Sequence, residues 1–177
     1  MKKPTWATSH PLLEKYYETE WGKPSKNDYY LFELLILEGF QAGLSWLTIL
    51  KKREAFKEAF EDFDYDRVTN YNEYDITRIL AIKDMIKNEL KIKCAIKNAI
   101  AFKEVQENFG SFSNYLWSFV GHETVVTEYS DENDIPTEND LSRAVSKDLK
   151  ERGFKFVGPI IIYSYLQAVG VINDKIV

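Results

Sequence analysis

The segment from Leu31 to Trp46 constrains this chain most, because it places a carboxylate on the apolar face of an expected helix. Leu31, Leu34 and Leu35 follow the i, i+3, i+4 spacing of a buried face, and Glu38 falls at i+7 on that face. Burying a charge is costly unless the charge is paired. Glu38 is therefore either a helix-end residue that is solvated or paired with an Arg, or a carboxylate that reads a ligand.

A short turn follows Glu38 and joins it to a large aromatic ring. Two glycines and a serine break the helical pattern, and a new helix is expected to begin near Ser45 with Trp46 in its first turn. A carboxylate and a flat ring held together by one turn suit a pocket that stacks on a planar ligand and accepts hydrogen bonds from its edge. The spacing alone does not separate this pocket from the solvated alternative.

The rest of the chain predicts an all-α fold, with helices joined by short turns in one domain over residues 1–177. Alternating strand pattern is scarce; residues 124–127 are a weak strand candidate, and residues 121–136 are expected to form a surface loop. Capping and stop residues predict helices over residues 9–21, 28–38, 46–60, 65–71, 76–81, 87–108, 111–120, 140–152 and 160–168.

The net charge of −5 argues against binding to DNA through bulk charge alone, although a local basic face remains compatible with it. Solvated helix faces are the usual explanation for runs of basic residues, and a phosphate-contacting surface is the alternative. Two such runs occur, one formed by Lys83, Lys87, Lys91, Lys93 and Lys97, the other by Lys147, Lys150, Arg152 and Lys155.

The low cysteine and histidine content indicates the cellular compartment of the protein and argues against a zinc site. Cys94 is the single cysteine, so no internal disulfide forms, and a reducing cytoplasm is the simplest compartment. His10 and His122 are far apart in sequence and show no zinc-binding spacing. The N-terminal segment lacks the apolar run of a signal peptide, and the most apolar stretch, residues 157–172, is too short and interrupted to span a bilayer.

An acidic run, Asp62-x-Asp64-x-Asp66 with Glu73 at the twelfth position, imitates a calcium-binding loop. That loop needs Gly at its sixth position for a sharp turn, and Arg67 is there instead. We interpret Asp64 as the cap of a short helix.

A helix–turn–helix pair is expected around Asp84, and free N–H groups at the start of its second helix can hold a DNA phosphate without reading sequence. A small domain that grips the backbone and also has an aromatic pocket with a carboxylate is suited to base flipping. Extruding a base is cheapest when the base is damaged, and stacking on aromatic rings offsets part of the cost.

Four segments together resemble the signature of the 3-methyladenine DNA glycosylase I family, bacterial enzymes of the helix-hairpin-helix superfamily. The similarity runs in register from about residue 6 to residue 174, which is nearly the whole chain. It is carried by Glu38-Gly-Phe-Gln-Ala-Gly-Leu-Ser-Trp-Leu-Thr-Ile-Leu-Lys-Lys-Arg-Glu54, by Glu20-Trp21-Gly22, by Leu116-Trp117-Ser118-Phe119-Val120 and by Arg152-Gly153-Phe154-Lys155-Phe156-Val157-Gly158.

The resemblance implies roles for the residues that match the family pocket. Glu38 matches the acid that hydrogen-bonds the flipped base, and Tyr16 and Trp46 match the rings that hold it. Trp6 and Trp21 match aromatic residues of the pocket wall. The implied reaction is hydrolysis of the N-glycosidic bond of 3-methyladenine in alkylated DNA without a lyase step. Alkylation makes the base cationic and a good leaving group, so a π-rich pocket and Glu38 would favour it.

The resemblance also implies contacts with duplex DNA. Gly43 and Leu44 match the turn that fills the gap left by the flipped base, with Gln41 beside it. The hairpin covers about residues 75–103, and Asp84 stands where the family has Gly, followed by the basic Lys87. Two helical lobes are implied, with the base pocket between them, and residues 1–25 join residues 155–177 in the terminal lobe.

Departures from the family pattern affect the metal and the pocket rim. The family usually holds a structural zinc with Cys, His, His and Cys, but the matching positions here are Pro4, Tyr17 and Lys175, and the sequence ends at Val177 before the fourth. We therefore predict no zinc and no other cofactor. Leu13 replaces a pocket Tyr.

Three functions remain open on the sequence. We expect an active, zinc-free 3-methyladenine glycosylase that acts as a monomer on double-stranded alkylated DNA, releases free 3-methyladenine and binds no membrane. The first alternative is a protein that recognises alkylated DNA without cutting it. The second is a helical interaction protein that has kept only the fold.

Overall fold

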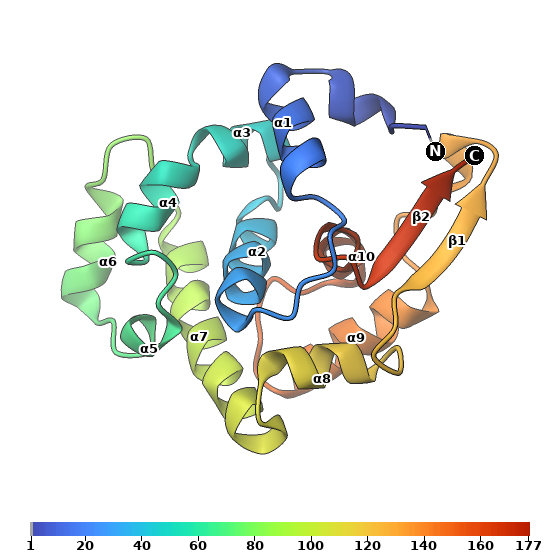
Figure 1. Ribbon diagram of the computed structural model, residues 1–177. Helices are drawn as coiled ribbons and strands as arrows, with labels where there is room; N and C mark the ends of the chain where they lie inside the picture. The colour runs from blue at the N-terminus through green and yellow to red at the C-terminus, as the bar shows by residue number, and fades with distance from the viewer. Residues whose placement is uncertain (1) are drawn as a thin grey trace.

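Helix α2 (Asp28–Phe40) is the element around which the others pack in the computed structural model, which describes residues 2–177. In Figure 1, α2 lies near the centre, between α7 (Glu89–Phe109) and α10 (Pro159–Ala168). Both helices contact α2. Leu31, Leu34 and Leu35 are buried, as their spacing predicts, and Glu38 is buried with them. A helix enclosed by other helices explains why the apolar face of α2 extends round most of its surface.

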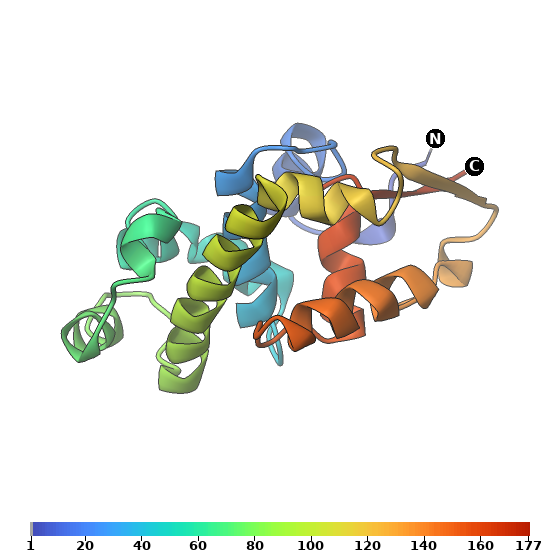
Figure 2. The same ribbon diagram turned by 90° about the horizontal axis from the view of Figure 1, so that it is seen from below.

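The remaining helices are short and surround this centre. Figure 2 shows α6 and the β1–β2 pair at opposite ends of the molecule, with α7 running from α6 toward the middle and α9 running across α10. The bounds are η1 Thr5–Thr8, α1 Pro11–Thr19, α3 Trp46–Lys51, α4 Arg53–Ala59, α5 Tyr65–Val68, α6 Glu73–Leu80, α8 Phe112–Ser118, η2 Glu132–Asp134 and α9 Asp140–Glu151.

Capping side chains begin most helices where the sequence predicts. The side chains of Asn27, Ser45, Asp64, Ser111 and Asn139 each accept a backbone N–H in the first turn of the helix that follows. These side chains satisfy donors that a helix N-terminus leaves unpaired. The cap of α2 is Asn27, whose side chain accepts from the backbone N–H groups of Tyr29 and Tyr30.

Several predicted helix bounds are wrong, and the helix expected over residues 65–71 ends at Val68. The helix expected over residues 46–60 divides at Lys52, where φ is −103° and ψ is 6°, into α3 and α4. The helix expected from residue 76 begins at Glu73, because Asn72 is its cap and Asp75 completes a capping box. The first helix starts at Pro11 with His10 as its cap, and a separate 3-10 turn precedes it.

A two-stranded parallel sheet closes the chain ends. Its first strand confirms the weak strand candidate at residues 124–127 and lies within the stretch 121–136 that was expected to be a surface loop. β1 (Val125–Tyr129) pairs with β2 (Ile172–Ile176), and Val125 lies opposite Ile172. Lys2 forms an antiparallel bridge with Ile176, so both ends of the chain lie beside the sheet, as Figure 1 shows. The all-α class is confirmed, since helices form the core and this pair of strands is the only sheet within residues 2–177.

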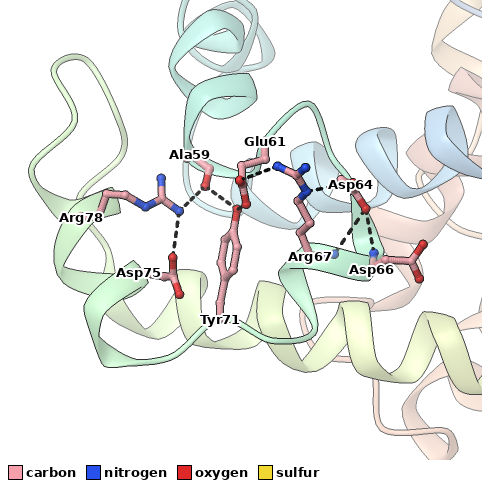
Figure 3. Close-up of polar contacts among 8 residues, drawn as sticks. All are labelled: Ala59, Glu61, Asp64, Asp66, Arg67, Tyr71, Asp75 and Arg78. Carbon is pink, nitrogen blue, oxygen red and sulfur yellow. Dashed lines mark hydrogen bonds and ion pairs between the residues drawn. The ribbon is translucent and has the colours of Figure 1, made fainter.

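The acidic residues after α4 cap a helix and form local hydrogen bonds and ion pairs (Figure 3). Asp64 Oδ1 accepts from the backbone N–H groups of Asp66 and Arg67, which confirms it as the cap of α5. Arg67 pairs with Glu61 at 3.1 Å, and the Tyr71 hydroxyl donates to the same carboxylate at 2.8 Å. Within residues 2–177, no group of three or more His, Cys, Asp or Glu side chains is arranged to hold a metal ion.

Between residues 2 and 177, no helix combines the length and the apolar character needed to cross a membrane.

Candidate active site

A cavity of about 500 Å³ opens between η1, α1, the end of α2, α3 and α10. All five residues that the sequence assigns to the base pocket face it, and so does Gln41. Its lining consists of Trp6, Ser9, Leu13, Tyr16, Trp21, Glu38, Gln41, Ser45, Trp46, Leu47, Ser164 and Gln167. A concave site with many apolar and aromatic walls and a few convergent polar groups is typical of small-molecule recognition.

Glu38 is the one ionisable carboxylate in this lining, and it is only 2% exposed. The Ser164 hydroxyl donates to its Oε1 at 3.2 Å, whereas Oε2 is buried without a hydrogen-bond partner among the described residues. Burial raises the pKa of Glu38 to about 8, against the lowering effect of the Ser164 hydrogen bond. A buried acceptor without a donor is rare in folded proteins, and it indicates a place for a ligand.

Aromatic rings form the walls beside Glu38. The rings of Tyr16 and Trp46 lie 5.6 Å apart between centroids with planes tilted by 53°, and Trp6 lies edge-on to Trp21 at 5.4 Å. The Tyr16 hydroxyl and Trp46 Nε1 are also buried without partners within residues 2–177. Three unpaired polar atoms therefore belong to residues of the same cavity, which makes it a prepared polar site with π faces around it.

A cluster of ionic contacts fixes the segment that carries Trp21. Arg53 Nη1 lies 2.7 Å from Glu20 Oε2, and Arg53 Nε lies 2.9 Å from Glu33 Oε2 on α2. The Tyr30 hydroxyl donates to Glu20 at 3.0 Å. Burial alone would raise the pKa of Glu20, but the hydrogen bonds and charge of Arg53 outweigh it and lower that pKa. The cluster links α2, α4 and the Trp21 segment.

The turn after α2 is held by a buried lysine. Lys91 Nζ donates to the backbone carbonyls of Phe40 at 2.8 Å and of Ala42 at 2.7 Å, and the side chain is 8% exposed. These carbonyls lie at a helix C-terminus, where cations are favoured. Gly43 has φ +80°, a conformation that glycine adopts readily, and Leu44 is 39% exposed at the tip of the turn.

The hairpin between α6 and α7 lies outside the cavity. Asp84 adopts a left-handed backbone with φ +67°, and Lys52 Nζ donates to its carbonyl at 2.8 Å. Asn88 caps α7, and Lys87 is exposed just before that cap. Asp84 and Lys87 do not line the cavity.

The positions that match the family's zinc ligands do not fit a zinc ion. Pro4 is buried and has no metal-binding group, and Lys175 lies in β2 opposite Glu128. The Tyr17 ring stacks on Trp21 with centroids 5.4 Å apart. None of the three offers a thiolate, imidazole or carboxylate. The chain ends here are tied by β-pairing and by aromatic packing.

Two polar residues of α10 were not predicted as site residues. Ser164 and Gln167 both line the cavity, and Ser164 contacts Glu38 although 126 residues separate them. The available signal was weak: two polar side chains, three residues apart, in an otherwise apolar helix. For the basic run that contains Lys91, the sequence predicts either a solvated face or a phosphate-contacting surface, and neither describes Lys91, because its amine is buried against α2.

Comparison with known proteins agrees with this geometry. A family model described as methyladenine glycosylase matches residues 6–177. The chain is 42% identical over 177 residues to DNA-3-methyladenine glycosylase 1 of Escherichia coli (strain K12), covering 100% of this chain and 95% of that protein. A crystal structure of 3-methyladenine DNA glycosylase I superposes with a TM-score of 0.92 at 41% identity, over 97% of this chain and 94% of that one. A tyrosine-to-phenylalanine variant of 3-methyladenine DNA glycosylase I in complex with 3-methyladenine gives a TM-score of 0.93 at 37% identity, over 97% and 92% of the two chains. The chain therefore belongs to the 3-methyladenine DNA glycosylase I family.

Proposed function

We propose that this protein is a monofunctional DNA glycosylase that hydrolyses the N-glycosidic bond of 3-methyladenine in double-stranded alkylated DNA. Its relatives are named DNA-3-methyladenine glycosylases, and a neighbouring structure has 3-methyladenine bound. The observation that carries the proposal is Glu38 Oε2, which has no hydrogen-bond partner within residues 2–177 and lies in an aromatic cavity that is large enough for a flipped base.

Glu38 reads and stabilises the base in this proposal. Alkylation at N3 leaves adenine with a positive charge, which the ionised carboxylate attracts and the rings of Tyr16 and Trp46 favour through their π faces. The free Oε2 accepts a hydrogen bond from the amino edge of the base. Trp6 and Trp21 close the wall of the pocket.

The chemical step needs little further catalysis, because the alkylated base is already a good leaving group. Water adds to C1′ of the sugar and loses a proton to the solvent, while the electrons of the N-glycosidic bond pass to the departing base, which leaves as the neutral molecule. The products are free 3-methyladenine and an abasic site, with the DNA strand intact. No described residue is required to form a covalent bond to the sugar.

The DNA contacts are proposed at two places. The exposed Leu44, carried on the Gly43 turn beside Gln41, fills the space that the flipped base leaves in the duplex. Lys87 and the first N–H groups of α7 hold a phosphate near Asp84. Asp84 adopts the left-handed conformation that the turn needs, but its carboxylate repels phosphate, so backbone affinity is expected to be modest.

Two observations favour the non-cutting alternative: this acidic hairpin, and Leu13, which lines the cavity where the family has a Tyr. Asp84 and Glu89 are both exposed where phosphate would bind. Weaker binding of the DNA backbone at the hairpin would leave recognition of the base in place. It would lower the fraction of bound DNA in which the base is held ready for cleavage.

The remaining expectations belong to the same proposal. We propose a monomer that acts in the cytoplasm, in line with the single, buried Cys94, and that needs no zinc or other cofactor.

Release of free bases from methylated duplex DNA, resolved by chromatography, tests the proposal. Selective release of 3-methyladenine by the wild type, strongly reduced in Glu38→Gln and Trp46→Ala, supports it. Glu54→Gln is the matched control, because Glu54 is an exposed carboxylate on α4 outside the cavity. Binding of alkylated duplex by folded protein without any base release favours the non-cutting alternative. If the protein binds neither alkylated DNA nor free 3-methyladenine, the result favours a helical interaction protein that has kept only the fold of the family.

A further inference from the structure

Gln167 on α10 lies between the base cavity and a second cavity. The second cavity has a volume of about 320 Å³ and is lined by Tyr163 and Asp174 among others. Gln167 and Ser164 line both cavities, whereas Asp174 lines only the second. Ser164 already donates its hydroxyl to Glu38, which leaves Gln167 as a polar side chain of α10 at the base cavity whose role is not yet assigned.

The orientation of the Gln167 amide follows from its hydrogen bond. Gln167 Nε2 donates to Asp174 Oδ2 at 2.8 Å, and the Tyr163 hydroxyl donates to the same oxygen. A carboxylate accepts and does not donate, so the nitrogen end of the amide must face Asp174. The carbonyl Oε1 is on the other branch of the amide, away from Asp174, and no donor within residues 2–177 is hydrogen-bonded to it.

We propose that Gln167 Oε1, oriented by Asp174, is a second hydrogen-bond acceptor for the flipped base and selects an exocyclic amino group over an exocyclic carbonyl. This inference rests on the proposed function. The amino group of an adenine-type base has two N–H donors, and Glu38 and Gln167 accept one each. A guanine-type base presents a carbonyl oxygen at the same edge.

Selectivity for an amino group arises because the side-chain amide of Gln167 cannot rotate by 180° to present its nitrogen instead of its oxygen. If the Gln167 amide rotated to present Nε2 to a carbonyl base, its Oε1 would face the Asp174 carboxylate, and two acceptors would meet without a proton. A site whose buried polar groups are left unpaired by the wrong ligand discriminates strongly against it. Asp174 is thus a positioning residue that acts through Gln167.

The test measures 3-methyladenine and 3-methylguanine released from the same methylated duplex, as a ratio of initial rates. In Gln167→Met, which keeps the side-chain length, 3-methyladenine release should fall about 3- to 10-fold while 3-methylguanine release does not fall, so the ratio shifts. Gln167→Leu should shift the ratio in the same direction. Since both bases come from one sample, the ratio does not depend on how much of the variant is folded.

Asp174 variants separate positioning from packing. Asp174→Asn keeps the shape of the side chain, but its own NH2 group can donate to Gln167 Oε1, so the Gln167 amide can rotate and the ratio should shift in the same direction as in Gln167→Met. Asp174→Leu removes both carboxylate oxygens and should shift the ratio in that direction as well. Gln106→Met is the matched control, because Gln106 Nε2 also donates to a carboxylate, Asp28 Oδ2 at 2.8 Å, away from the cavity.

A wild-type ratio in both Gln167 variants, or an equal fall for both bases, overturns the inference. If the wild type releases no 3-methylguanine, the affinities of the protein for the two free bases replace the release rates. They are measured by titrating the tryptophan fluorescence of the protein with each base. A wild type that releases no 3-methyladenine contradicts the proposed function itself, whatever the variants show.

Discussion

The Ser164 hydroxyl donates to one carboxylate oxygen of Glu38 at 3.2 Å, and the other oxygen of Glu38 has no partner among residues 2–177. One helix, α10, thus orients the carboxylate while leaving its second oxygen available to a ligand. The arrangement costs stability, because burial raises the pKa of Glu38 to about 8. Sites kept for function commonly carry such a cost.

Replacing Glu38 should make the protein more stable, by an amount that depends on pH. Glu38 has a pKa of about 8 in the folded protein and an ordinary value near 4.5 when unfolded. The folded state therefore holds the proton more tightly, and wild-type stability falls as pH rises from about 4.5 through 8. In Glu38→Gln this loss disappears, a gain of at most about 5 kcal/mol above pH 8. Urea unfolding of both proteins at pH 4.5, 7 and 8.5 measures it, and a difference that does not grow with pH contradicts the assignment.

Removing the Ser164 hydroxyl should move the pH dependence of excision. Its hydrogen bond favours the ionised form of Glu38, so Ser164→Ala should raise the pKa of Glu38 above about 8. Wild-type excision is expected to increase with pH as Glu38 ionises. The variant should be about 2- to 10-fold slower at pH 7 and should approach the wild type at higher pH. Ser118→Ala on α8 is the control, and an equal loss at every pH would indicate mere packing.

Losing the Lys91 amine should disturb the turn that carries Leu44. Lys91→Met leaves the carbonyls of Phe40 and Ala42 without their donor, which should lower the free energy of unfolding by about 1–3 kcal/mol. Excision should fall further than the folded fraction does. Lys93→Met, an exposed residue of the same helix, should change stability by less than about 0.5 kcal/mol. Thermal melts and single-turnover rates, measured together, check both effects.

Breaking the Arg53 cluster should destabilise the fold more than breaking a surface pair. Arg53 is 18% exposed and pairs with two carboxylates, so Arg53→Met should cost about 2–4 kcal/mol by stranding Glu20 and Glu33. Arg67 is 66% exposed, and Arg67→Met should cost at most about 0.5 kcal/mol. Equal losses in denaturant unfolding would show that the Arg53 contacts are solvated.

The purified protein should contain no stoichiometric zinc. Pro4, Tyr17 and Lys175 supply no ligand for it, so chelator treatment should leave melting temperature and excision unchanged. Elemental analysis measures the metal directly. One zinc per chain, lost on chelation together with stability, would contradict this prediction.

The sequence by itself determined the parts of this protein that depend on local spacing. The caps at Asn27, Ser45 and Asp64 follow from side chains that reach N–H groups two or three residues ahead. The meeting of Glu38 and Trp46 follows in the same way from one short turn between two helices.

Only the tertiary structure decided the contacts between distant segments. β1 pairs in parallel with β2, and this joins residues as far apart in the sequence as Val125 and Ile172. The residues of one strand do not indicate which other strand it pairs with. Ser164 and Gln167 enter the cavity because α10 packs against α2, and Lys91 is buried because α7 lies against the end of that helix. Burial and pairing of polar groups are properties of the packed molecule, since each depends on atoms that the chain brings together from far apart.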